Sequence, residues 1–121
     1  MKNYKPLLVW FLLLFSSASL AGEADVIEVS VNKNSSNSYS FTVAVLHKDA
    51  GWEHYADKWE VSDEEGTILG TRTLHHPHVN EQPFTRSLSG VEIPDHIKTV
   101  EVRAHDSVHE YGGKVISLKL P

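Results

Sequence analysis

Apolar and polar residues alternate in short runs along most of the chain, and clusters of turn-forming residues separate the runs. The clearest run is residues 39–45, where aromatic or branched apolar residues occupy every second position. No stretch after the first 21 residues shows the roughly 3.6-residue period of an amphipathic helix. The runs predict strands at residues 26–31, 39–45, 55–61, 67–74, 84–91, 99–105 and 116–120. Their spacing predicts an all-β fold, an immunoglobulin-like or fibronectin-III-like antiparallel β-sandwich of about seven strands.

The first 21 residues predict a secretory signal peptide. Two lysines precede an unbroken apolar run from Leu7 to Phe15, and Ser19 and Ala21 are the small residues that favour cleavage after Ala21. The apolar run is shorter than the roughly 20 residues that a membrane-spanning helix needs. We therefore expect residues 22–121 to form a single β-sandwich domain, periplasmic or secreted, with no membrane attachment after cleavage.

Charge and sulfur content exclude several functions. Two of the 11 Lys and Arg residues precede the predicted cleavage point, so nine face 16 Asp and Glu in the remainder, a net charge of −7. Such a surface repels phosphate backbones, and we expect no nucleic-acid partner. The chain has no cysteine, and its one methionine is Met1. Thiolate zinc sites, iron–sulfur clusters and blue-copper centres are therefore excluded.

The histidines are the one feature that indicates chemistry. Seven of the eight fall in three segments, 47–54, 75–78 and 105–109, each between two predicted strands. Because each strand crosses the domain once, successive connections alternate between its two ends. These three segments are every second connection, so we expect them at one end, with His96 at the other.

Imidazole and carboxylate groups without sulfur are typical ligands of Cu(II) and Zn(II). Copper is favoured first because its complexes are the more stable, and zinc second. The candidate ligands are His47, His76, His78 and His109, with His54, His105, Glu81 and Asp106 as substitutes or as groups that orient the ligands. Their spacing matches no established metal signature. The primary interpretation is a periplasmic metal-binding protein whose partners are a metal ion and, as a further candidate, another envelope protein.

Three other functions remain open from the sequence. The aromatic residues Trp52, Tyr55 and Tyr111 lie within or directly beside these segments and could stack on a sugar or contact a protein. A metal-bound water with Glu53 or Glu81 as a base would make a small metal-dependent enzyme, although no substrate is indicated and a simple binder is favoured. The histidines could also serve as a pH switch near their ordinary titration range.

Three stretches resemble a group of small exported bacterial proteins of unknown function with an immunoglobulin-like or fibronectin-III-like sandwich. They are residues 51–59, 76–87 and 105–113, and the likeness as a whole extends over most of the predicted domain. The resemblance implies a bacterial source and an envelope location, and it implies no activity. The chain departs from the group at Glu110, where the pattern has glycine.

Overall fold

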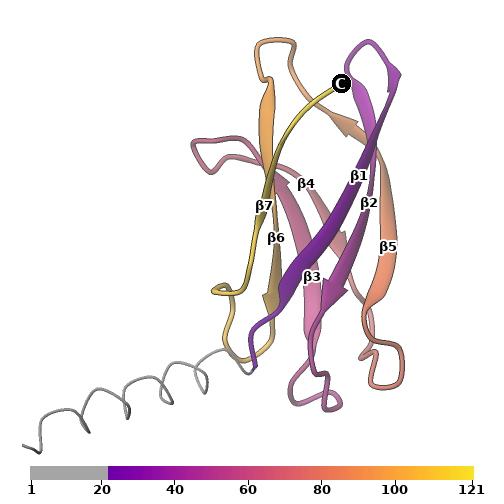
Figure 1. The fold of residues 1–121 in the computed structure, drawn as a ribbon, viewed down its shortest axis with the longest axis vertical. Helices are drawn as coiled ribbons and strands as arrows, with labels where there is room; N and C mark the ends of the chain where they lie inside the picture. Colours follow the sequence, from indigo (N-terminus) through magenta and orange to yellow (C-terminus); the bar gives the residue numbers. More distant parts are fainter. Residues whose placement is uncertain (1–21) are drawn as a thin grey trace, which may run out of the picture.

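The computed structural model describes residues 22–121, so the predicted signal peptide lies outside the described residues. Seven strands run through this part of the chain (Figure 1). They are β1 (Asp25–Ser35), β2 (Ser38–Leu46), β3 (Ala56–Ser62), β4 (Ile68–Thr73), β5 (Phe84–Glu92), β6 (Thr99–Asp106) and β7 (Ile116–Lys119). Every predicted strand is confirmed, with boundaries that differ by a few residues. Among residues 22–121 no helix is long or apolar enough to cross a membrane.

The strands form two antiparallel sheets that pack face to face. One sheet has the order β1-β2-β5, and the other has the order β4-β3-β6-β7. The all-β fold with about seven strands is thus confirmed. The alternation of apolar and polar residues explains the arrangement, because successive side chains of a strand point to opposite faces.

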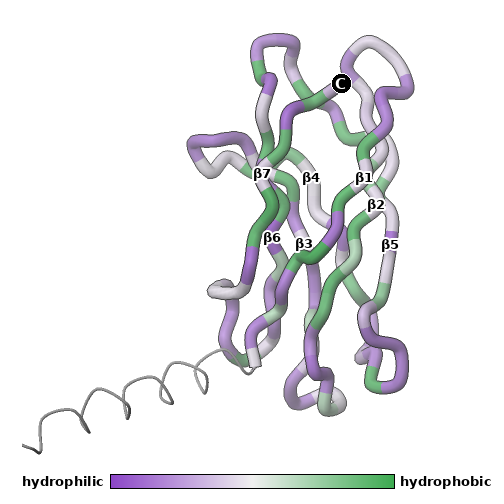
Figure 2. The backbone as a smooth tube through the Cα atoms, viewed as in Figure 1, coloured by the Kyte–Doolittle hydropathy of each residue, from purple (hydrophilic) through white to green (hydrophobic). Residues whose placement is uncertain are grey.

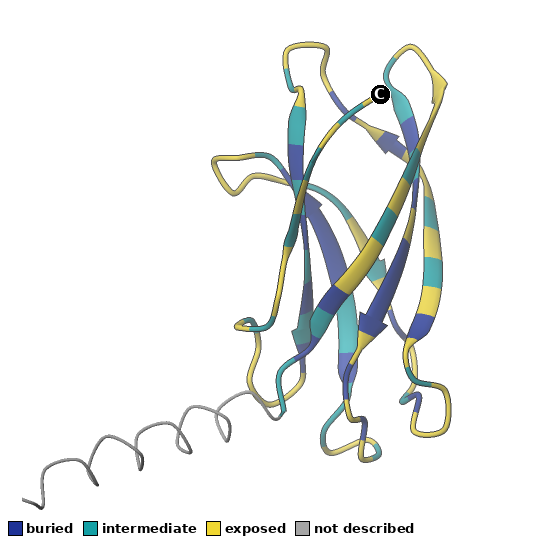
Figure 3. Ribbon diagram, in the orientation of Figure 1, coloured by how far each residue is buried: buried dark blue, intermediate teal, exposed yellow. Residues whose placement is uncertain are grey.

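The core lies between the two sheets and is almost wholly apolar. Trp59, Phe41 and Phe84 are its largest fully buried side chains, each 0% exposed. Apolar segments run through the middle of the strands, whereas the connecting loops are mainly hydrophilic (Figure 2). The central strands β2 and β3 are the most continuously buried (Figure 3). With no cysteine in the chain, this packing rather than a disulfide holds the sandwich together.

The segment that precedes β1 is held tightly against the end of the β6–β7 connection. Ala24 is 1% exposed, and a Cβ added to Gly113 would lie 2.0 Å from its carbonyl oxygen. The Lys114 N–H donates to Asp25 Oδ1 at 2.7 Å, and the Val26 N–H donates to the Lys114 carbonyl at 2.9 Å. Only glycine at position 113 permits this close approach of the two backbones.

One loop residue is strained. Glu110 has a φ of 62°, in the left-handed region that favours glycine, and it forms a two-way backbone pair with Asp106. We expect Glu110→Gly to raise the free energy of unfolding by up to about 1 kcal/mol, because relief of the strain outweighs the entropy that glycine adds to the unfolded chain. Urea denaturation measures the difference.

The matched control for that change is Glu65→Gly. Glu65 is also exposed and lies in a turn, but its φ is not positive. Glycine there adds unfolded-state entropy without relieving strain, so we expect a small loss of stability. If both variants lose stability equally, the backbone of Glu110 is not strained.

Candidate metal centre

The three histidine-bearing loops lie at one end of the domain, as the alternation of connections predicts. The β2–β3, β4–β5 and β6–β7 connections all lie at the lower end of Figure 1, together with the start of β1. Direct contacts join them. The His47 N–H donates to Gln82 Oε1 at 2.9 Å, and Tyr55 and Ser107 exchange hydrogen bonds. Residues from four separate segments therefore build one surface.

His47 is the most deeply buried imidazole of this end. The alternation that points Val43 and Val45 of β2 into the core continues by one more step to His47, whose side chain is 0% exposed. The same continuation on β6, from Val102 through Ala104, brings Asp106 inward, also with a side chain 0% exposed. Strand geometry thus turns a histidine and a carboxylate toward each other at the rim of the core.

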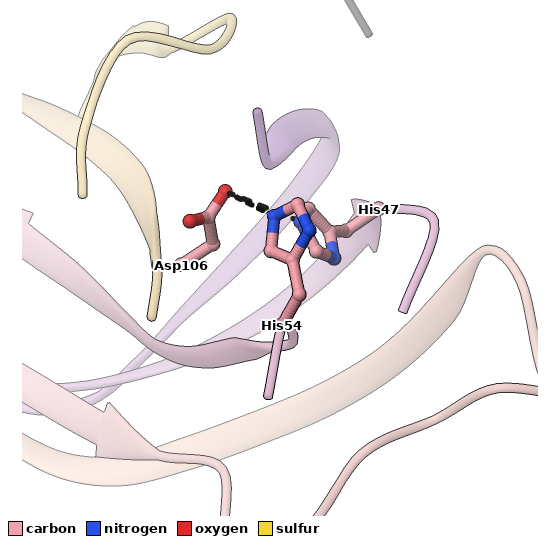
Figure 4. A group of neighbouring side chains, drawn as sticks. All are labelled: His47, His54 and Asp106. Atoms are coloured by element: carbon pink, nitrogen blue, oxygen red, sulfur yellow. Dashed lines mark hydrogen bonds and ion pairs between the residues drawn. The ribbon is translucent and has the colours of Figure 1, made fainter. Parts of the chain in front are cut away.

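Four atoms converge at this rim. His47 Nε2 lies 3.2 Å from Asp106 Oδ2, and His54 Nε2 lies 3.5 Å from the same oxygen (Figure 4). Both imidazole nitrogens lie 3.1 Å from the carbonyl oxygen of Gly22. We call His47, His54, Asp106 and the Gly22 carbonyl the rim cluster. Its His54 side chain is 25% exposed, so solvent reaches the cluster from that side.

The ring of His47 faces more hydrogen-bond acceptors than the single N–H of a neutral imidazole can serve. The ring of His47 faces three oxygens and no donor: Asp49 Oδ1 at Nδ1, and the Gly22 carbonyl and Asp106 Oδ2 at Nε2. A neutral imidazole has one N–H and one lone pair. If Nδ1 donates to Asp49, the lone pair of Nε2 faces two oxygen atoms. A cation beside Nε2 would satisfy this lone pair and both oxygen atoms.

The surroundings of Asp106 favour the ionised form of its carboxyl group. Burial is the largest influence and opposes its charge, whereas hydrogen bonds from the backbone N–H groups of His109 and Val108, at 2.5 and 2.8 Å, favour it. Together with the charge of nearby His47 and His109, they place the pKa of the Asp106 carboxyl below its ordinary value. Both N–H groups bond Oδ1, so Oδ2 is the oxygen that faces the imidazoles.

Asp49 supports the cluster from behind, and sequence reasoning did not select it as a site residue. Its side chain is 0% exposed, and its Oδ1 accepts hydrogen bonds from His47 Nδ1 and from the Ala56 N–H. Its Oδ2 accepts the His78 N–H at 2.7 Å. Asp49 thereby fixes the orientation of the His47 ring, as carboxylates do for metal-ligating histidines.

The predicted ligands of the β4–β5 loop lie beside the rim cluster but do not join it. The His78 ring stacks on Phe84 with a centroid separation of 4.2 Å, and its Nδ1 has no hydrogen-bond partner among the described residues. Burial, with the charges of Arg86 and His76, lowers the pKa of His78, so this ring is neutral near pH 7. His76 is exposed, and its ring lies against the ring of His78.

Of the remaining predicted ligands, one borders the rim cluster and two pair with residues outside it. The His109 ring packs edge-on against His54, at a centroid separation of 5.0 Å, and so borders the cluster. His105 Nδ1 bonds Asp57 Oδ1 at 2.6 Å on the outward face of β6. Glu81 pairs with Arg86 at 3.1 Å. The first-ranked set of His47, His76, His78 and His109 is therefore not gathered around one point.

The loop aromatics are also divided. Trp52 is 66% exposed and packs edge-on against Tyr55 at 5.5 Å. Tyr111 instead donates its hydroxyl to Glu60 at 3.0 Å and lies under the Arg103 guanidinium. Burial and the Glu60 carboxylate raise the pKa of Tyr111. Of the three aromatic side chains, Trp52 and Tyr55 therefore pack together, whereas Tyr111 contacts Glu60 and Arg103.

Comparison with known proteins found one informative relative. The chain is 39% identical over 94 residues to a protein of the archaeon Halomicrobium mukohataei named "Putative lipoprotein". The match includes 78% of this chain and 46% of that protein, so the chain spans about half the length of its curated relative. No protein-family profile and no solved structure matches the chain.

Proposed function

We propose that the rim cluster binds a divalent transition-metal ion and that the protein is an exported metal-binding protein. The observation that carries the proposal is the convergence of two imidazole nitrogens on two oxygen atoms, the Gly22 carbonyl oxygen and Asp106 Oδ2. A metal ion at this point would accept all four lone pairs. His47 would then keep its ring proton on Nδ1 and donate it to Asp49. Metal-bound histidines ordinarily donate their other ring N–H to a carboxylate or carbonyl in this way.

The distances between the ligand atoms of the rim cluster suit a divalent transition-metal ion if the side chains move slightly closer to it. His47, His54 and Asp106 each offer one ligand atom, and the three atoms lie within 4.8 Å of one another. Three atoms this close always have a common point within about 2.8 Å of each, against roughly 2.0–2.2 Å for zinc–nitrogen and zinc–oxygen bonds. Two nitrogens and two oxygens without sulfur suit Zn(II) and Cu(II), and Cu(II) is expected to bind more tightly.

The order of strands supports the fibronectin-III-like form of the sandwich. In an immunoglobulin constant-type domain the fourth strand joins the sheet of the first, second and fifth strands. Here β4 pairs with β3 in the opposite sheet. Export is supported by the signal-like residues 1–21 and by the name of the archaeal relative. Because this chain contains no cysteine, it offers no thiol for the lipid of a lipoprotein.

Titration with Cu(II) and Zn(II) tests the metal site, with His54→Ala compared with His76→Ala. The unsubstituted protein is expected to bind with a Kd below about 1 μM, or roughly −8 kcal/mol. His54→Ala should weaken binding at least tenfold because it removes a converging nitrogen. His76→Ala removes an exposed imidazole outside the rim cluster and should leave the affinity unchanged.

Two outcomes would overturn parts of this assignment. Binding no tighter than micromolar would exclude the metal site, and His47 would then be a buried imidazole paired with Asp49 and Asp106. A loss in the His76 variant that equals the loss in the His54 variant would show that the rim cluster alone is not the metal site. A rise in melting temperature on adding metal, reversed by a chelator, measures the same binding through stability.

A further inference from the structure

Gly22 contributes a backbone atom to the rim cluster, and it is also the residue that follows the predicted cleavage point. Its carbonyl oxygen lies 3.1 Å from both His47 Nε2 and His54 Nε2. A Cβ added to Gly22 would lie 2.9 Å from His109 Nε2, so a third imidazole borders its Cα. The backbone nitrogen is one bond, about 1.46 Å, from that Cα. The nitrogen of Gly22 therefore belongs to a residue whose carbonyl oxygen contacts two imidazoles and whose Cα is bordered by a third.

The position of Gly22 is set by contacts on the residues that follow it. Ala24 is buried, and Asp25 and Val26 are hydrogen-bonded to Lys114. These contacts lie within the described domain and do not involve residues 1–21. Release of the preceding segment would therefore leave Gly22 anchored at the rim cluster by its own neighbours in the chain.

We propose that cleavage after Ala21 makes Gly22 the first residue and that its α-amino nitrogen joins its carbonyl oxygen as a ligand of the metal ion. The proposal rests on the proposed function and deepens it. Amine nitrogen and carbonyl oxygen of one residue are joined through Cα and C, so both can bind one ion in a five-membered ring. An α-amino group gives up its proton near pH 8, whereas a lysine does so above about pH 10.

This assignment explains two features together. The rim cluster has a backbone carbonyl where a side-chain ligand would be expected, and the residue that supplies it is glycine. Glycine leaves the space of a Cβ to His109. Signal cleavage would then convert an amide nitrogen, which is a poor ligand, into an amine. The metal site would be completed only in the exported protein.

The test uses the full 121-residue chain, exported by a bacterial host and purified with its natural processing. Intact mass first establishes the N-terminus, which is expected at Gly22. An insertion variant with one alanine between Ala21 and Gly22 keeps the signal but moves the amine away by one residue. Its Cu(II) affinity is expected to fall at least tenfold. An alanine inserted between Glu64 and Glu65, in the exposed turn at the opposite end, is the matched control and should bind normally.

A spectroscopic signature identifies the amine directly. Electron paramagnetic resonance of the Cu(II) protein should change its nitrogen coupling when glycine is labelled with ¹⁵N, because Gly22 is then a labelled ligand. An N-terminus elsewhere than Gly22, an unchanged coupling, or equal affinity in the two insertion variants would overturn the inference. In those cases weaker binding by His54→Ala would show that the side-chain metal site stands. Loss of binding in every form, the unsubstituted protein included, would reject both proposals.

Discussion

Asp49→Asn is expected to lower the free energy of unfolding of the metal-free protein by about 2–4 kcal/mol. The buried carboxylate accepts hydrogen bonds from Ala56 and His47 on one oxygen and from His78 on the other. Asparagine replaces one oxygen with an NH₂ group, which must face a donor in either orientation. One buried N–H and one buried NH₂ would then point at each other, and the negative charge of Asp49 beside His47 would be lost.

Urea denaturation in the presence of a chelator measures this loss without a contribution from bound metal. Glu64→Gln is the matched control, because it removes one negative charge from an exposed turn residue with no hydrogen bond or ion pair among residues 22–121. Its effect should stay within about 0.5 kcal/mol. A loss below about 1 kcal/mol for Asp49→Asn would show that the loops are held together by other contacts.

The fold could be predicted closely from the sequence because its signal is local. Strand alternation depends only on each residue and its neighbours two positions away, so residues 39–45 identify β2 without knowledge of the other sheet. The placement of three loops at one end follows from the same count of crossings. Which sheet β4 joins could not be predicted in this way, because its pattern is weak and its register depends on β3.

The site could be predicted only in part, and the residues show why. Extending the alternation of β2 and β6 by one step past Val45 and Ala104 selects His47 and Asp106 and turns His105 outward. That signal was available in the sequence. The position of the His78 ring outside the rim cluster depends on its stacking against Phe84, a contact that no local pattern encodes. A backbone carbonyl such as that of Gly22 has no residue-type signature at all.

Asp106→Asn is expected to weaken Cu(II) and Zn(II) binding at least 100-fold, or about 2.7 kcal/mol, while the domain remains folded. Asparagine keeps an oxygen that can accept the N–H groups of Val108 and His109. The change therefore falls on Oδ2, the oxygen that faces the two imidazoles. An NH₂ group there can donate to a neutral His47 but cannot bind a cation.

The pH chosen for the metal titration follows from the lowered pKa of Asp106. A carboxyl with a lowered pKa contributes stability that is complete above its unfolded-state value, near about pH 4, and is lost as the pH falls through the folded value. At pH 7 Asp106 is therefore ionised, and a difference in affinity reports the ligand rather than its protonation.

Asp57→Asn is the matched control, since Asp57 also pairs with a histidine, His105, but on the outward face of the sheet. Asp57→Asn removes the same negative charge from β3, which pairs with β6, the strand that ends at Asp106. It should leave metal affinity within about twofold of the unsubstituted protein. Equal losses would show that the net charge of this end attracts the ion. A loss confined to Asp106→Asn would require the carboxylate itself at the convergence of His47 and His54, which separates a coordinated ion from a diffuse one.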